Sequence, residues 1–212
     1  MKIAKQASTA SKLPFFAEVV ESSLYGWKSE CWDFTTLPVF GSLVTVQTQQ
    51  RTIFGIVHQS NTSSQDPARH VYAYQKTYEE LVVEQPQIFA FLQTRFECLT
   101  VGFSQDDKIV YQIAPEHPQI HTFVRYASPE QSALFFSSPL YLSVLFEASN
   151  LQNLDELLLA SMWNQRNQGR LTESAITAFI DHFSMLTGND YRRVKLFMQR
   201  LEANNLLNQD KL

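Results

Sequence analysis

Residues 39–59, VFGSLVTVQTQQRTIFGIVHQ, carry the strongest secondary-structure signal in the chain. From Leu43 to Gln47 the side chains alternate with the two-residue period of a β-strand, whose successive residues face opposite sides. The polar stretch Gln49–Arg51 follows, and Thr52–Gln59 supplies a second β-rich run. Two such runs joined by a short polar turn predict a β-hairpin.

Further short β-rich runs lie on both sides of this hairpin. They are Phe16–Ser22, Trp27–Thr35, Phe96–Phe103 and Ile109–Ile113. Short strands at close spacing, too few for a sandwich, predict a small closed barrel, which leaves few exposed edges. Between them we expect a loop at Asn61–Ala68, a short strand at Val71–Tyr74 and one or two helical turns within Tyr78–Leu92.

The pattern becomes helical after the Pro-rich junction 114–118. Ser128-Pro129-Glu130-Gln131 has the residues of a helix start, with serine as the N-cap and proline at the first position. Three more helices are expected at Asn153–Gln168, Thr172–Leu186 and Tyr191–Asn204. The predicted fold class is therefore α+β: a polar tail at 1–13, a small N-terminal β-barrel at 14–115 and an all-α region at 116–212.

The amino-acid composition indicates a globular protein and argues against several other classes. The 212 residues are 44% hydrophobic and 18% charged, as expected for a globular chain, and the net charge is −4. No apolar run reaches the roughly 20 residues that span a bilayer. The first residues lack the apolar core of a signal peptide, and the two cysteines cannot form a disulfide framework. We therefore expect a cytoplasmic protein with reduced cysteines.

Catalytic motifs are absent from the sequence. None of the six glycines begins a phosphate-binding loop, and GxGxxG, GxSxG, HExxH and CxxC patterns do not occur. His117 and His121 have the spacing of a metal-binding pair on a helix, but Pro118 interrupts it, so a surface pair is favoured. We expect no catalytic residue, no cofactor and no metal.

Two groups of residues are candidates for partner contacts. Aromatic residues are enriched at protein interfaces, and the first zone is rich in them. The candidate partner contacts are Phe15, Trp27, Phe40 and His58. The last helix holds the main basic concentration, which suits an anion or an acidic partner, although a solvated helix face is the favoured interpretation because Asp190 and Glu202 lie in the same helix. Its residues are Arg192, Arg193, Lys195 and Arg200.

Three short motifs carry a family resemblance. Gly41-Ser42-Leu43-Val44, Gly55-Ile56-Val57 and Val101-Gly102-Phe103 resemble the HAS barrel, the small barrel of HerA-type DNA translocases and of the rotary ATP synthase head. Ala17 stands where the first strand of that barrel usually has glycine. The resemblance covers residues 14–113, and the helical remainder resembles stand-alone cyanobacterial and plastid members without an ATPase domain. It implies a module that docks onto partner subunits.

The sequence thus predicts a non-enzymatic protein–protein docking or assembly module of a larger complex. Fold alone does not determine function, so two alternatives stay open. The chain could bind nucleic acid through the barrel face or the basic helix 190–200, although neither half of it is basic. It could also be an enzyme whose site uses His58 or His117.

Overall fold

The computed structural model describes most of the chain. The predicted tail 1–13 lies outside the described residues, which are 15–66, 68, 71–106, 108–149, 151–188 and 190–207. Among the described helices, none combines the length and the apolar character needed to cross a bilayer.

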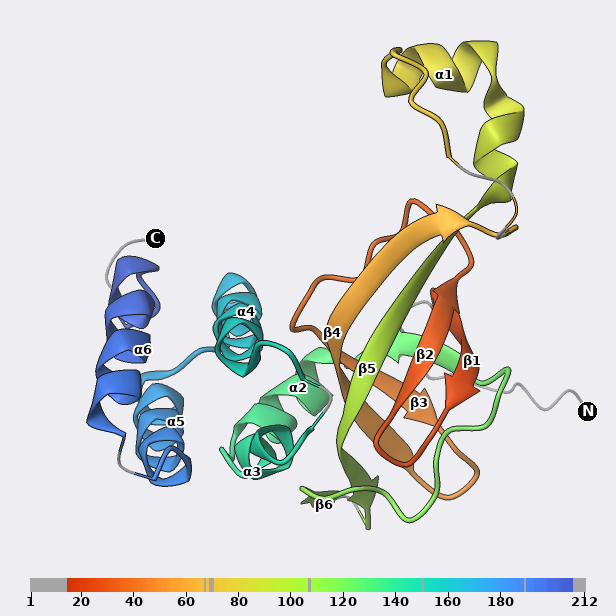
Figure 1. The fold of residues 1–212 in the computed structure, drawn as a ribbon. Coiled ribbons are helices and arrows are strands. Elements are labelled where there is room, and N and C mark those ends of the chain that lie inside the picture. The colour runs from red at the N-terminus through yellow and green to blue at the C-terminus, as the bar shows by residue number, and fades with distance from the viewer. Residues whose placement is uncertain are drawn as a thin grey trace, which may run out of the picture.

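Six antiparallel strands close into a barrel, which confirms an α+β fold (Figure 1). Their order is β2–β1–β7–β3–β4–β5, and β5 pairs back with β2. A short strand, β6, extends the sheet beside β5. The strands are β1 Ala17–Ser22, β2 Gly26–Cys31, β3 Leu43–Gln47, β4 Thr52–Ser64, β5 Leu92–Gln105, β6 Lys108–Val110 and β7 Phe123–Tyr126.

The hairpin expected from the sequence is present as β3 and β4, paired from Leu43↔Ile56 to Gln47↔Thr52. Two strands differ from expectation. β7, which bridges β1 and β3, lies beyond residue 115, where the sequence analysis ended the barrel. β4 continues through the expected loop at Asn61–Ala68 as far as Ser64.

Successive side chains of β3 and β4 point to opposite faces and are buried in two different hydrophobic cores. Val44, Val46 and Ile53 belong to the cluster that fills the barrel. Their neighbours Leu43 and Phe54 belong to a second cluster, shared with the helices. Because both faces of this hairpin are covered, the segment from Thr52 to Val57 is buried without interruption.

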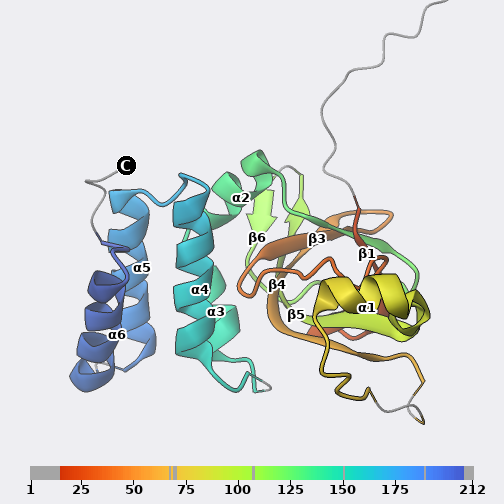
Figure 2. The same ribbon diagram turned by 90° about the horizontal axis from the view of Figure 1, so that it is seen from above.

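Helices cover one side of the barrel in two layers (Figure 2). They are α2 Pro129–Phe136, α3 Tyr141–Phe146, α4 Leu154–Asn167, α5 Glu173–Leu186 and α6 Tyr191–Ala203. The expected N-cap at Ser128 is confirmed, since its side chain accepts a hydrogen bond from the Gln131 N–H, and the Ser128 N–H donates in return to the Gln131 side chain. In Figure 2, α4 stands between the barrel and the α5–α6 pair.

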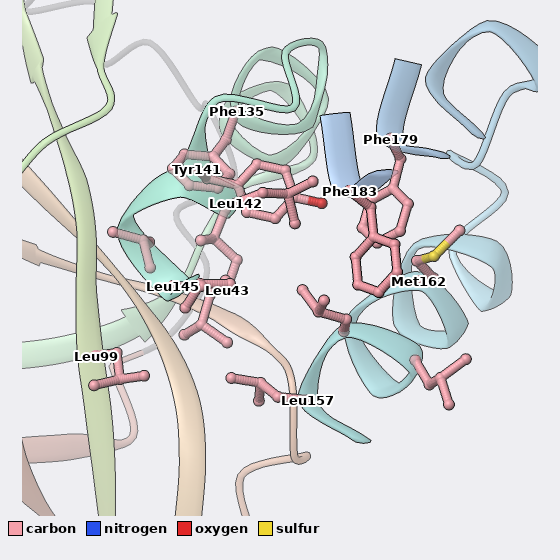
Figure 3. Packing of buried hydrophobic residues seen from close by; sticks show 14 of the residues in the cluster. Leu43, Leu99, Phe135, Tyr141, Leu142, Leu145, Leu157, Met162, Phe179 and Phe183 are labelled. Atoms are coloured by element: carbon pink, nitrogen blue, oxygen red, sulfur yellow. The ribbon is translucent and has the colours of Figure 1, made fainter. Parts of the chain in front are cut away.

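A common hydrophobic core joins the helices to the barrel. Figure 3 shows Leu43 and Leu99 from the strands near Leu142 and Leu145 of α3, with Phe183 of α5 on the far side. Each of these five side chains is at most 6% exposed. The helical region and the barrel are therefore packed as one body.

A two-stranded arm projects from the barrel, away from the core that the barrel shares with the helices (Figure 1). We define the arm as residues 59–94, in which the ends of β4 and β5 form a two-stranded ribbon. Its tip, residues 65–91, carries α1 Tyr78–Glu84 and the 3₁₀ helix η1 Pro86–Phe91, and projects away from the barrel (Figure 1). These helices confirm the expected helical turns. Val71–Tyr74 is irregular, so the short strand expected there was wrong.

Candidate protein-docking surface

The tip has almost no core of its own. Neither α1 nor η1 contains a buried residue. Large apolar side chains of the tip are instead exposed to solvent: Val71, Tyr72, Tyr74, Tyr78, Val82, Val83 and Phe91, from 38% to 81% exposed. Soluble proteins rarely gather large apolar side chains at the surface unless another molecule covers them.

Local sequence explains why α1 exposes this surface. Thr77 caps the helix in a capping box with Glu80, which satisfies backbone N–H groups at the helix start. Tyr78 and Val82 are four residues apart and share one face, whereas Val83 is turned about 100° away.

One aromatic contact anchors the tip to the barrel. Phe89 of η1 stacks on Phe34, with ring centroids 5.8 Å apart, and also meets Tyr78 at 5.1 Å. The Phe34 carbonyl accepts a hydrogen bond from the hydroxyl of Thr94, at 2.5 Å. The tip is therefore held in a defined place although most of its apolar surface is uncovered.

A groove of about 600 Å³ runs between the base of the tip and the barrel wall. Its walls include Phe34, Phe89 and Trp32, together with carboxylates from Glu18, Glu30 and Asp33. Glu18 lies 2.5 Å from the imidazole of His121, which also lines the groove, and Glu30 is paired with Arg95 at 3.0 Å. The Thr35 N–H and hydroxyl both donate to the Asp33 carboxylate and hold its pKa below the usual value. The groove is therefore aromatic and acidic.

Phe15, a predicted contact, lies in an aromatic patch beside this groove. Its ring is 5.5 Å from that of Phe123, which in turn meets Trp32 edge-on at 5.1 Å. The three residues are 40–55% exposed, and the Arg125 guanidinium lies 5.7 Å from the Phe15 ring. This patch, Phe15–Trp32–Phe123, is accessible from the solvent, and the contact of Phe15 with a partner stays a prediction.

Trp27 is not a surface residue, which corrects the sequence interpretation. It is 2% exposed and lies inside the barrel. The strand GWKSEC alternates, with Trp27 and Cys31 inward and the charged Lys28 and Glu30 less buried. Those two charges were the signal that the indole faces the core.

Phe40 and His58 lie on other parts of the barrel. Phe40 is 39% exposed, and its carbonyl accepts a hydrogen bond from the Asn164 side chain of α4, at 2.9 Å. His58 lines a hollow of about 270 Å³ with Glu97 and Lys28. Burial lowers the pKa of His58, which favours the neutral imidazole, and Glu97 partly opposes that effect.

The four basic residues of α6 do not form one free cluster. Arg193 is paired with Asp155 at 2.7 Å and Arg200 with Glu156 at 2.5 Å, so both tie α6 to the start of α4. Arg192 and Lys195 are exposed, as is the paired Arg200, whereas Arg193 is half-buried. The structure therefore brings only part of the predicted anion-contact set to the solvent.

The part of the chain that the structure describes has no group of three or more His, Cys, Asp or Glu side chains placed to hold a metal ion. Cys31 and Cys98 are buried free thiols; burial raises the pKa of Cys31 to about 12 and also raises that of Cys98. The Ser143 hydroxyl and His182 Nε2 are 3.0 Å apart and link α3 to α5 beside a cleft of about 970 Å³.

The tip was missed in the sequence analysis. The signal available was the run Leu81-Val82-Val83 inside a seven-residue helix. Successive residues of a helix are turned by about 100°, so three consecutive apolar residues cannot all face one neighbour. A solitary helix with such a run exposes some of them.

No protein-family model matches the chain, and no curated protein matches it. The function is therefore argued from the geometry of the chain itself.

Proposed function

We propose that this protein is a non-enzymatic docking module that binds a protein partner through the tip of its arm. The observation that carries the proposal is the exposure of large apolar side chains on a tip whose helices bury none. Burying such side chains against a partner contributes about 25 cal/mol per Å² of apolar surface. The barrel and helices would then be the scaffold that positions this surface.

Charge indicates the chemistry of the partner. Within the tip the sequence has Asp66, Glu79, Glu80 and Glu84 against two basic residues, one of which, Lys76, is paired with Glu84. The neighbouring groove adds the Asp33 carboxylate, together with Glu18 beside His121 and Glu30 paired with Arg95. A complementary partner surface is therefore apolar at its centre and basic at its rim. The resemblance to HAS barrels without a motor domain supports the same function.

A pair of tip substitutions tests the proposal. In Val82→Ser/Val83→Ser the chain keeps its fold, because neither side chain is buried. We expect the variant to lose the protein that the wild-type chain captures from a native extract. Met185→Ser is the matched control, since Met185 is 73% exposed on α5, outside the tip.

Position-specific crosslinking identifies the surface directly. A photoreactive amino acid at position 83 should label the same partner, and one at position 185 should not. Equal capture by the tip variant and the wild type would contradict the proposal. So would turnover of a small substrate by a chain that captures no protein.

A further inference from the structure

The outer edge of β4 is unpaired along the arm. β3 pairs with β4 only between Thr52 and Ile56, and the last bonds on that side join Val57 to Gly41 and Ser42, at 2.8 and 3.0 Å. Beyond Val57, β4 pairs with β5 alone, as far as Ser64. Within the described chain no backbone hydrogen bond reaches this edge from another segment, and residues 59–63 are all exposed.

The register shows which backbone groups face outward. The Gln65 N–H donates to the Phe91 carbonyl at 2.8 Å, in line with the pair Ser64↔Leu92. Hydrogen-bonded residues alternate along an antiparallel ladder. Residues 59, 61 and 63 therefore face β5, and the N–H and C=O groups of residues 60, 62 and 64 face away from it.

The hydrogen bonds between β5 and β2 lead independently to the same assignment of inward-facing and outward-facing residues in β4. The Thr100 N–H donates to the Tyr25 carbonyl at 3.0 Å, so even-numbered residues of β5 face β2. Odd-numbered residues such as Arg95 must then face β4, where Arg95 is the partner of Asn61. Both strands place Asn61 on the inner ladder and its two neighbours on the free edge.

This edge lacks the usual protection against strand pairing. Sheet edges in soluble proteins commonly carry lysine, proline or a covering segment. Residues 59–64 read QSNTSS, without a charge or a proline. The edge therefore offers three donors and three acceptors to another extended chain.

We propose that a second copy of this chain pairs with the edge, so that two arms form a four-stranded sheet across a two-fold axis at Thr62. Antiparallel pairing about Thr62 sets Ser60 opposite Ser64 of the partner subunit and Thr62 opposite Thr62 of the partner subunit. All three outward-facing residues then meet outward-facing residues, which gives six backbone hydrogen bonds. The contact is isologous, as in most soluble homodimers.

The side chains favour a second copy over a foreign strand. Strand-addition sites select foreign strands through pockets for alternate side chains. The six residues QSNTSS are small or uncharged and polar, and they form cross-strand Ser–Ser, Asn–Ser and Thr–Thr pairs with themselves, without like-charge contacts. Because the strands run in opposite directions, the acidic tips lie at opposite ends of the shared sheet.

Sedimentation analysis of the full chain tests the pairing. The contact is small, so we expect the mean mass to rise with concentration from 24.4 kDa toward twice that value. Ser60→Pro removes an outward N–H and leaves the β4–β5 ladder intact, and should raise the dimer dissociation constant at least about tenfold. Ser60→Ala keeps the N–H and should match the wild type.

Oxidative crosslinking locates the axis without relying on the proline variant. Hydrogen-bonded partners in an antiparallel sheet have Cα atoms about 5.5 Å apart, which suits a disulfide. Thr62→Cys should therefore form a disulfide dimer rapidly, and Ser149→Cys, exposed beside α3, should not.

Three results would each overturn the inference: a constant mass of 24.4 kDa, a dimer that Ser60→Pro does not weaken, or equal crosslinking at positions 62 and 149. The inference does not depend on docking at the tip. Val82→Ser/Val83→Ser should leave the dimer unchanged, so failure of one proposal is distinguishable from failure of the other.

Discussion

Gly55 shows how a single residue fixes the inside of the barrel. A Cβ atom at this position would lie 2.3 Å from the Trp27 ring. The absent side chain is therefore what lets the indole cross the barrel beside β4. The sequence places Gly55 in a short motif, Gly55-Ile56-Val57, but does not reveal the packing contact, because the ring that needs the space is far away along the chain.

Substitution of Gly55 should reveal this contact. We expect Gly55→Ala to lower the free energy of unfolding by about 1–3 kcal/mol, since overpacking forces the ring or the strand to move. Denaturant titration measures the loss, and near-ultraviolet circular dichroism reports the shifted indole. Gly188→Ala is the control: its Cβ meets nothing within 4 Å, and its φ of +63° alone costs about 1 kcal/mol. An unchanged indole signal in Gly55→Ala would contradict the packing.

At the scale of elements, α6 is held to α4 through charged side chains. The Arg193 guanidinium is paired with Asp155 and lies 5.3 Å from the Phe146 ring and 5.7 Å from the Phe183 ring. Arg192, one position earlier, is exposed. Neighbouring arginines on one helix thus have different roles, which the basic composition of the helix did not distinguish.

The two arginines give a matched pair of substitutions. Arg193→Ala should lower the free energy of unfolding by about 1–2 kcal/mol, because it removes a partly buried ion pair and a cation–π contact. Arg192→Ala should stay within about 0.5 kcal/mol of the wild type. Thermal or denaturant unfolding of both variants measures the difference. Equal effects would mean that Arg193 contributes nothing beyond a solvated charge.

The elements predicted correctly are those with a strong local signal. The β3–β4 hairpin has a clear alternation, and α2 and α5 have serine and threonine caps that bond as expected. The extension of β4 to Ser64 was missed because residues 59–63 of this strand are all exposed, so it has no buried side to leave an alternating pattern. β7 and α3, of four and six residues, are too short for periodicity to appear.

The candidate docking site was predicted less well than the fold. Phe15 was correctly placed at the surface, but Trp27 was not, and the exposed residues of the tip were not singled out. Aromatic content indicates that an interface is plausible, whereas exposure depends on which elements pack together. That information is long-range and is not contained in a single stretch of sequence.

At the scale of the whole molecule, the shared core ties the barrel to the helices. Leu43, Phe54, Ile56, Leu99 and Val101 belong to strands but are buried in the cluster that includes α2–α6. Each such side chain contributes about 1.5–3 kcal/mol when fully buried. Together they match the whole stability of a typical domain, roughly 5–15 kcal/mol.

The chain should therefore unfold in one transition. Far-ultraviolet circular dichroism, dominated by the helices, and fluorescence, which includes Trp27 inside the barrel, should give coincident curves. A fragment ending at residue 127 should not fold stably and should bind a hydrophobic dye. Two separate transitions, or a stable fragment, would show that the barrel folds without its helical cover.

The uninterrupted course of β5 has a mechanical consequence. At about 3.3 Å per residue, its 14 residues reach roughly 45 Å, from the base of the tip to the strand face under α3. A flexible linker would let a captured molecule wander within a sphere, whereas a hydrogen-bonded ribbon sets its distance and orientation. A partner bound at the tip is therefore held at a fixed distance and orientation relative to the barrel and its helices.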